Sequence, residues 1–139
     1  MQPPFEILEH PADIGFRAYG NTREELYQNA ALALFSLACD LATVEELESR
    51  EIETAGSDEE ALLYAWLAEL LAVSEADRLV FRRAEIRSLD TERIRGVAYG
   101  ELYNRARHQR GTHIKAVTFH QLRVDQTPAG WSAQVYLDL

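Results

Sequence analysis

The sequence predicts an α+β fold, built as a single-domain sandwich in which two amphipathic helices pack on a largely antiparallel sheet. Two segments have apolar residues at helical spacing, and each is preceded by a helix-capping pattern. Most of the remaining segments alternate apolar and polar residues, as strands with one buried face do. No linker or internal repeat interrupts the chain, so residues 1–139 are expected to form one domain.

The two helices are predicted from their first turns. Thr22 followed by Glu25 forms a capping box, and the apolar spacing after it ends near Cys39. Ser57 with Glu60 forms the second box, before an apolar pattern that includes Leu62, Leu63, Trp66, Leu67, Leu70 and Leu71. Each helix therefore has an apolar face that needs a sheet to cover it.

Seven segments are predicted to be strands. They are residues 5–8, 14–20, a short stretch around Ile52, and residues 79–89, 94–102, 114–124 and 131–139. The last two are expected to form a hairpin joined by residues 125–130. In the final strand the odd positions from Trp131 to Leu139 are mainly apolar and the even positions more polar, so one face is assigned to the core and the other to solvent.

Composition excludes several classes of protein. No run approaches the roughly 18 apolar residues of a membrane span, and the first ten residues do not resemble a signal peptide. We therefore expect a cytoplasmic protein. Cys39 is the only cysteine, which excludes an internal disulfide and favours a small buried apolar side chain.

The net charge of −9 opposes direct binding of a phosphate backbone. The charge is uneven, because residues 1–77 are strongly acidic and residues 78–139 carry an excess of arginine. Two differently charged solvated faces explain this distribution best, and a dedicated RNA surface is the alternative.

Two carboxylates are candidates for a metal site. Asp13 closes the segment that begins at His10 and lies at the entrance of a predicted strand, while Asp138 and the terminal carboxylate of Leu139 end another. If these groups converge, their hard oxygens suit Ca²⁺ or Mg²⁺. The alternatives are that Asp13 only bonds turn amides and that Asp138 belongs to a frayed terminus.

Lys115 is the only lysine beside thirteen arginines. A compact ammonium at one position suggests a role that a planar guanidinium cannot fill, although chance is the alternative. On a regular strand, Lys115 and His120 face opposite sides. Glu69 and Glu101 are expected to be solvated or ion-paired acids, and the basic loop (residues 103–113) lacks metal-ligand spacing.

No catalytic motif is present. The chain has no phosphate-binding glycine loop, nucleophile elbow, HExxH or paired CxxC. We therefore expect that the protein is not an enzyme.

Six segments of the sequence carry a family resemblance. They are HPADIG at residues 10–15, LLYAWLAELL at 62–71, LVF at 79–81, Gly100-Glu101, IKAVTFH at 114–120 and the ending Leu137-Asp138-Leu139. Together they resemble the archease family. The family forms HTADIG and KAVTYH appear here with Pro11 and Phe119. The residues AVSEADR after the second helix are more polar than in the family.

The resemblance implies an accessory protein of the RtcB-type RNA ligase, which joins tRNA halves and other RNAs ending in a 3′-phosphate. It implies promotion of ligase guanylylation and turnover, with RNA met only through the ligase. It also implies a metal, with calcium expected and magnesium or manganese as alternatives, bound by Asp13, Asp138 and a carbonyl of Leu139. Partner or phosphate contacts are expected at Lys115, His10, His120, Glu101 and Glu69.

Two other classes of function remain open from the sequence. One is a metal-dependent hydrolase that uses Asp13 and Asp138, although no base or pocket is evident for it. The other is a chaperone-like binding module with a large exposed apolar patch.

Overall fold

The computed structural model describes residues 2–9 and 13–139. Two long helices and one short 3₁₀ helix are present: α1 (Arg23–Ala38), η1 (Leu41–Thr43) and α2 (Glu59–Ala76). Eight strands accompany them: β1 (Phe5–Glu9), β2 (Ile14–Gly20), β3 (Glu48–Ala55), β4 (Leu79–Leu89), β5 (Arg93–Leu102), β6 (Ala116–Val117), β7 (Arg123–Thr127) and β8 (Gly130–Asp138). None of the described helices is long and apolar enough to cross a membrane.

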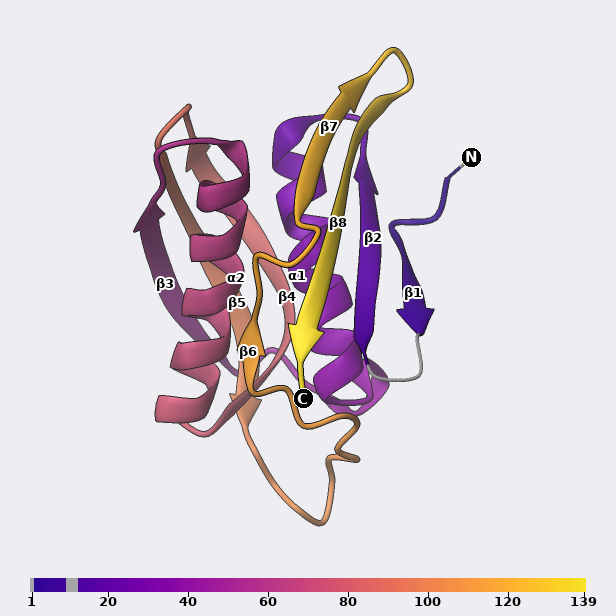
Figure 1. Ribbon diagram of the computed structural model, residues 1–139. Coiled ribbons are helices and arrows are strands. Elements are labelled where there is room, and N and C mark those ends of the chain that lie inside the picture. Colours follow the sequence, from indigo (N-terminus) through magenta and orange to yellow (C-terminus); the bar gives the residue numbers. More distant parts are fainter. Residues whose placement is uncertain (1, 10–12) are drawn as a thin grey trace.

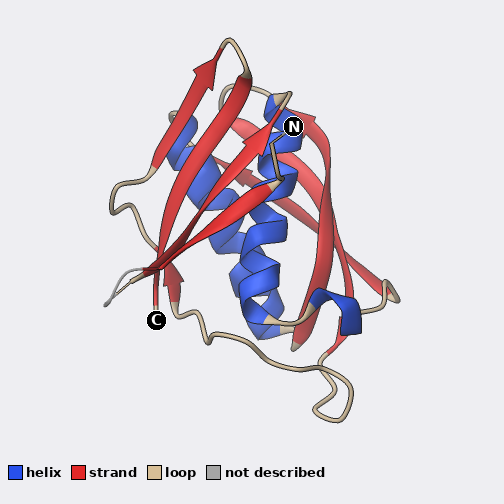
Figure 2. Ribbon diagram, turned by 90° about the vertical axis from the view of Figure 1, so that its right-hand side faces the viewer, coloured by secondary structure: helices blue, strands red, loops and turns tan. Residues whose placement is uncertain are grey.

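The strands form two antiparallel sheets with the helices between them (Figures 1 and 2). The first sheet has the order β1-β2-β8-β6, and β7 pairs with β8 as well; the second has the order β3-β5-β4. Helix α1 contacts both β2 and β4, whereas α2 contacts β3, β4 and β6. The predicted α+β class is confirmed, and the two sheets add a second layer of strands to the predicted arrangement.

The second sheet has a physical reason in the composition of α1. Its buried residues are Leu26, Tyr27, Ala30, Ala31, Ala33, Leu34 and Phe35. At about 100° per residue these positions cover more than half of the helix circumference. A single sheet covers a narrower apolar stripe. Helix α1 therefore needs strands on two sides.

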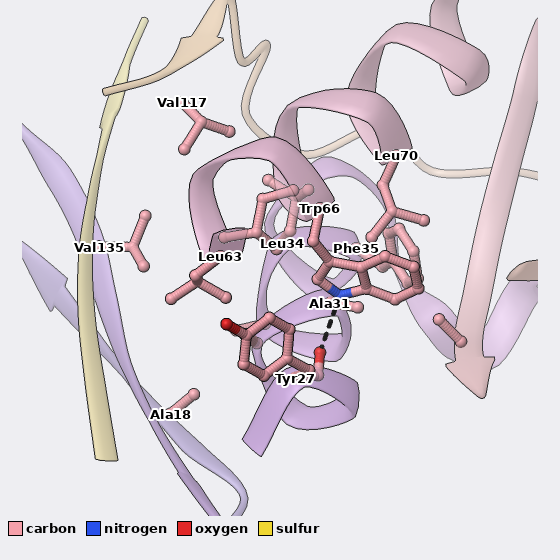
Figure 3. Packing of buried hydrophobic residues seen from close by; sticks show 14 of the residues in the cluster. Ala18, Tyr27, Ala31, Leu34, Phe35, Leu63, Trp66, Leu70, Val117 and Val135 are labelled. Carbon is pink, nitrogen blue, oxygen red and sulfur yellow. Dashed lines mark hydrogen bonds between the residues drawn. The ribbon is translucent and has the colours of Figure 1, made fainter. Parts of the chain in front are cut away.

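The core lies between the two sheets, around Trp66 (Figure 3). Its ring is fully buried, and its Nε1–H donates a hydrogen bond of 3.1 Å to the carbonyl oxygen of Tyr27, which joins α2 to α1. The hydroxyl of Tyr27 donates to the carboxylate of Glu59 at 2.7 Å, and Arg23 pairs with the same carboxylate. The polar atoms of these buried aromatic side chains are thus satisfied.

The first helix begins as predicted, whereas the second begins one residue later. The hydroxyl of Thr22 accepts from the N–H of Glu25, and α1 ends at Ala38, with the buried Cys39 as its C-cap. The N-cap of α2 is Asp58, whose carboxylate accepts from the N–H of Ala61 at 2.8 Å. The prediction of Ser57 as the cap was therefore wrong, because the adjacent aspartate occupies the capping position.

The predicted strand over residues 114–124 is not continuous. Regular pairing with β8 stops after Val117 and resumes at Arg123. Between them the chain turns, with Gln121 at a φ of 52° and the N–H of Leu122 bonded to the carbonyl of Phe119. The hairpin of β7 and β8 is confirmed, but it is tighter than predicted, since Thr127 pairs directly with Gly130.

The face of β8 that was predicted to be exposed to solvent is also partly buried. Ala133, Val135 and Leu137 are in the core as expected, but Gln134 and Tyr136 on the opposite face are buried too. The side chain of Gln134 accepts from Arg17 and donates to the carbonyl of Gln121. The turn between β6 and β7 therefore folds over this face.

The helix cap gives a first prediction. Asp58→Ala removes the acceptor for the N–H of Ala61, so we expect a loss of about 1 kcal/mol in the free energy of unfolding, measured by urea denaturation. Ser57→Ala is the matched control and should change stability by less than about 0.5 kcal/mol. A larger loss in the Ser57 variant would contradict the assignment of the cap.

Candidate functional site

One end of the first sheet collects three strand ends that are distant in the sequence (Figure 1). Ile14, the first residue of β2, pairs with Leu137 of β8. Continuing this antiparallel register by one residue pairs Asp13 with Asp138. Residues directly opposite each other on neighbouring strands have Cβ atoms about 5 Å apart. The two aspartates that the sequence singled out therefore adjoin Ile14 and Leu137, which the structure pairs with each other.

Both aspartates lie on the outer face of the sheet. They have the same parity as Gly15 and Tyr136, which pair with each other, and the opposite parity to the core residue Leu137. Both are exposed to solvent. Because neighbouring carboxylates repel each other when charged, a cation between them would be favourable.

Lys115 reaches the same end of the sheet from β6. Its backbone N–H donates a hydrogen bond of 2.8 Å to the carbonyl oxygen of Asp138. Ala116 pairs with Asp138, so Lys115 has the parity of Val117, which faces the core. Its side chain is exposed and lines a pocket beneath the sheet end. Leu139, next along β8, is 44% exposed.

His120 lies on the outer face of the sheet. Its ring is 6.0 Å from the ring of Tyr136, and a Cβ added at Gly15 would lie 2.7 Å from Cδ1 of Tyr136. His120 is therefore on the side of the sheet that carries the aspartates, opposite to Lys115. The strand is irregular between Lys115 and His120, but the predicted separation of these two side chains onto opposite faces is consistent with these contacts.

Two other contact residues were predicted, Glu69 and His10. Glu69 is exposed on α2 and has no hydrogen bond or ion pair to any residue that the structure describes. It therefore adds nothing to the geometry of the site. His10 falls outside the described residues.

Glu101 is buried in a cluster that anchors the basic loop (residues 103–113). Arg107 donates to both of its oxygens, at 2.8 and 2.9 Å, and the N–H of Glu45 donates at 2.6 Å. Nε2 of His108 lies 3.1 Å from the same carboxylate, in poor hydrogen-bond geometry. Since Nδ1 of His108 accepts from the N–H of Asn104, the proton of a neutral ring is on Nε2 and faces Glu101.

This cluster shifts the pKa of the buried acid. Burial alone raises the pKa of Glu101, but the hydrogen bonds from Glu45 and Arg107, together with the nearby ring of His108, outweigh it and lower the pKa from 4.5 to about 2. Both carboxylate oxygens are used inside the protein. Glu101 therefore positions the loop and is not presented to a partner.

A pocket of about 670 Å³ lies beside Lys115. Its walls come from the end of α2, the start of β4 and the segment from Tyr103 to Lys115. Arg78, Tyr103 and Arg110 line it, and the sequence analysis singled out none of them. The only signal in the sequence was the arginine content of the basic loop. This signal does not show that the end of α2 and the start of β4 form the facing wall of the pocket.

Comparisons with known proteins identify the family of this chain. The model of the Archease protein family (MTH1598/TM1083) matches residues 5–139. Protein archease of Methanosarcina acetivorans is 46% identical, over 97% of this chain and 95% of the relative, and that of Pyrococcus abyssi is 39% identical, over 97% and 98%. The chain belongs to the archease family. The resemblance seen in the sequence is confirmed.

Two solved structures share the archease fold. The solution structure of Methanobacterium thermoautotrophicum protein 1598 has a TM-score of 0.83 and 37% identity, and the match covers 98% of this chain and 99% of that one. The crystal structure of a Thermotoga maritima archease, described as a possible chaperone, has a TM-score of 0.64 and 22% identity, and the match covers 100% of this chain and 98% of that one. The second likeness concerns the fold alone.

The donor set at the sheet end of this archease fits a hard divalent cation. Asp13 and Asp138 offer carboxylate oxygens, and Leu139 adds a carbonyl oxygen. Among the described residues, no three side chains of His, Cys, Asp or Glu come close enough to form a metal cluster. A metal here would depend on two carboxylates, backbone oxygen and water, which suits Ca²⁺ or Mg²⁺ better than Zn²⁺.

The Glu101 cluster gives a prediction for pH dependence. Because the folded-state pKa of Glu101 lies below its usual value, the charged acid stabilises the archease fold above pH 4.5, and this is lost as pH falls toward about 2. Glu101→Gln should lower stability by about 2 kcal/mol at pH 7 and flatten the decline of Tm across that window. Glu45→Gln, which keeps the backbone N–H, is the control and should retain the decline.

Proposed function

We propose that this archease activates an RNA ligase of the RtcB type and has no reaction of its own. In this proposal it promotes guanylylation of the ligase and lets the ligase turn over repeatedly in tRNA splicing and RNA repair. In this proposal the protein encounters RNA through the ligase. The proposal rests on membership of the family, together with the role that the resemblance implies for it.

One observation supports it most directly. The pairing of β2, β8 and β6 puts Asp13, Asp138 and Lys115 at one exposed end of the first sheet. Two acids and one ammonium at a solvent-exposed end are suited to contact a partner's charged site. None of them is needed for the core, which is assembled from apolar residues elsewhere.

The two aspartates would hold a divalent cation, with calcium expected and magnesium or manganese as alternatives. Both lie on the outer face, where opposing carboxylates repel without a bridging charge. A bound cation supplies positive charge for a phosphate or a carboxylate of the ligase. The protein itself would hold the carboxylates of Asp13 and Asp138 side by side at the end of the sheet.

Lys115 would contact a phosphate or an acidic group of the ligase complex. Its backbone is fixed by the bond to Asp138, while its side chain is exposed and has no ion pair within the described residues. The backbone of Lys115 is thus fixed at the same sheet end as the aspartates, while its ammonium, on the opposite face, is free to bind another anion. Stability alone does not explain this arrangement, because the group stabilises no neighbour.

Metal binding by the aspartates is the first prediction of this proposal. Asp13→Asn and Asp138→Asn should each weaken binding of Ca²⁺ at least tenfold, since each removes a charged oxygen ligand. Titration calorimetry measures this, with Mg²⁺ and Mn²⁺ as parallel arms. Asp125→Asn, an exposed acid in the distant hairpin, is the control. Equal affinity in all three variants would remove the metal from the proposal.

The second prediction concerns the identity of the cation at residue 115. Lys115→Arg keeps the charge but replaces a compact ammonium with a longer planar group, so we expect activation of the cognate ligase to fall about tenfold or more. Arg95→Lys on the exposed surface of β5 is the reverse substitution and should have no effect. Full activation by the Arg variant would mean that any cation suffices there.

The third prediction tests activation itself. Substoichiometric protein, added with GTP and the metal of the ligase, should convert a single round of ligation into many rounds and raise the guanylylated fraction of the ligase. An activator must favour one ligase state over another, because equal binding to all states shifts no population. The double variant Asp13→Asn, Asp138→Asn should fold normally and fail.

Two outcomes would replace this proposal with another function. Cleavage or joining of RNA by the purified protein alone would favour a hydrolase or ligase activity. Suppression of the aggregation of unrelated proteins, with no effect on the ligase, would favour a chaperone-like module.

A further inference from the structure

The pocket beside Lys115 has the size and shape of a small-ligand site. Its volume of about 670 Å³ falls within the range of roughly 300–1,000 Å³ for pockets that hold small molecules. Leu79 and Ile114, both almost fully buried, provide apolar wall, and Tyr103 provides an aromatic ring. Such walls suit the flat, partly apolar part of a ligand.

The cations that line this pocket are unpaired. Seven of the thirteen arginines lie within 4.0 Å of a carboxylate: Arg17, Arg23, Arg50, Arg82, Arg83, Arg87 and Arg107. Arg78, Arg110 and Lys115 have no such partner among the described residues, and all three line the pocket. In a chain of net charge −9, carboxylates are abundant. Glu75 is the one acid in the lining.

The two guanidinium groups are held by different parts of the fold. Arg78 follows the last turn of α2 with a φ of 55°, a left-handed conformation that favours glycine or asparagine. An arginine there is conformationally unfavourable, and its side chain makes no bond to the described residues that offsets the strain. Arg110 lies over the ring of Tyr103, 4.1 Å from its centroid.

The wall that carries Arg110 is anchored. The N–H of Gly111 and that of Thr112 donate to carbonyls at the end of α1, and the Glu101 cluster holds the start of the same loop. The pocket is therefore formed between fixed elements before any ligand arrives. Pre-formed sites lose less entropy on binding.

We propose that this pocket binds a nucleotide, with its phosphates between Arg78, Arg110 and Lys115 and its base against the apolar wall. Guanidinium groups bind phosphate through paired N–H donors, and the ammonium adds a compact charge. The combination of an aromatic and apolar wall with three cations matches a nucleoside phosphate better than a bare anion. The nucleotide is either free in solution or the 3′-phosphorylated end of an RNA, because both present this chemistry.

An acidic peptide of a partner is the competing ligand. It also carries anions, but it is extended and would need a groove that runs beyond the pocket. The volume of about 670 Å³ and the apolar wall favour the nucleotide. The peptide is therefore included in the experiment as an outcome that would overturn the proposal.

This inference goes beyond the proposed function, because the ligand binds this chain itself without a ligase. Failure of the ligase assay leaves it standing, and failure of nucleotide binding leaves activation standing. To keep the metal separate, binding is measured without divalent cations.

The experiment is titration calorimetry of the whole protein at low salt with GTP, with GMP, with a short RNA ending in a 3′-phosphate and with a polyglutamate peptide. We expect saturable binding of GTP or of the RNA, weakened by added salt. Binding of GTP and GMP would indicate a free nucleotide, and binding of the RNA alone would indicate an RNA end. Saturable binding of the peptide alone, or no binding of any nucleotide probe up to about 1 mM, would overturn the proposal.

Variants assign the binding to the pocket. Arg78→Gly and Arg110→Gln should each weaken binding about tenfold, because each removes a charged donor to phosphate. Arg78→Gly also relieves the left-handed backbone, so Tm should rise or stay unchanged, which separates lost binding from lost folding. Glu75→Gln should tighten binding, and Arg95→Gln, an unpaired arginine outside the pocket, should leave it unchanged. Equal binding by all four variants would place the ligand elsewhere and overturn the proposal.

Discussion

The antiparallel pairing of β2 with β8 joins early and late parts of the chain through seven residue pairs. Because side chains alternate along a strand, a shift of one residue would exchange the two faces of β8. Val135 and Leu137 would leave the core, and Asp138 would no longer lie opposite Asp13. Core packing and the geometry of the candidate site thus depend on the same register. The apolar residues that select it are fully buried or nearly so.

Much of this was readable from the sequence, because it follows from local patterns. Alternation in residues 131–139 predicted β8, and the same parity assigned Asp138 to the outer face. Two features of the fold could not be predicted from local patterns. The strand over residues 114–124 is interrupted because the turn at Gln121 folds over Gln134 and Tyr136, which alternation alone does not reveal. The choice of Asp58 over Ser57 depended on competition between adjacent capping residues.

The candidate site likewise has a part that the sequence predicted and a part that it did not. The sequence placed Asp13 and Asp138 at strand ends, and the structure pairs the residues next to them, Ile14 and Leu137. The pocket was not predicted, because its walls come from α2, β4 and the basic loop, and no short segment contains the pattern. Glu101 was expected to be solvated or ion-paired. It is ion-paired, with Arg107. Because it is also buried, it accepts from the N–H of Glu45 as well, and these contacts hold the start of the basic loop.

The position of β8 in the first sheet has a consequence for the order of folding. The strands β3, β4 and β5 lie within residues 48–102, so the second sheet and both helices can assemble from segments that are close in the sequence. β8 follows all other strands in the chain but lies between β2 and the pair β6 and β7. Until it is synthesised, β2 has no partner on that side, and the helix faces beneath the first sheet stay exposed. Closure of the first sheet is therefore a late, long-range event, and the unpaired edge of β2 is open to association with other chains during that interval.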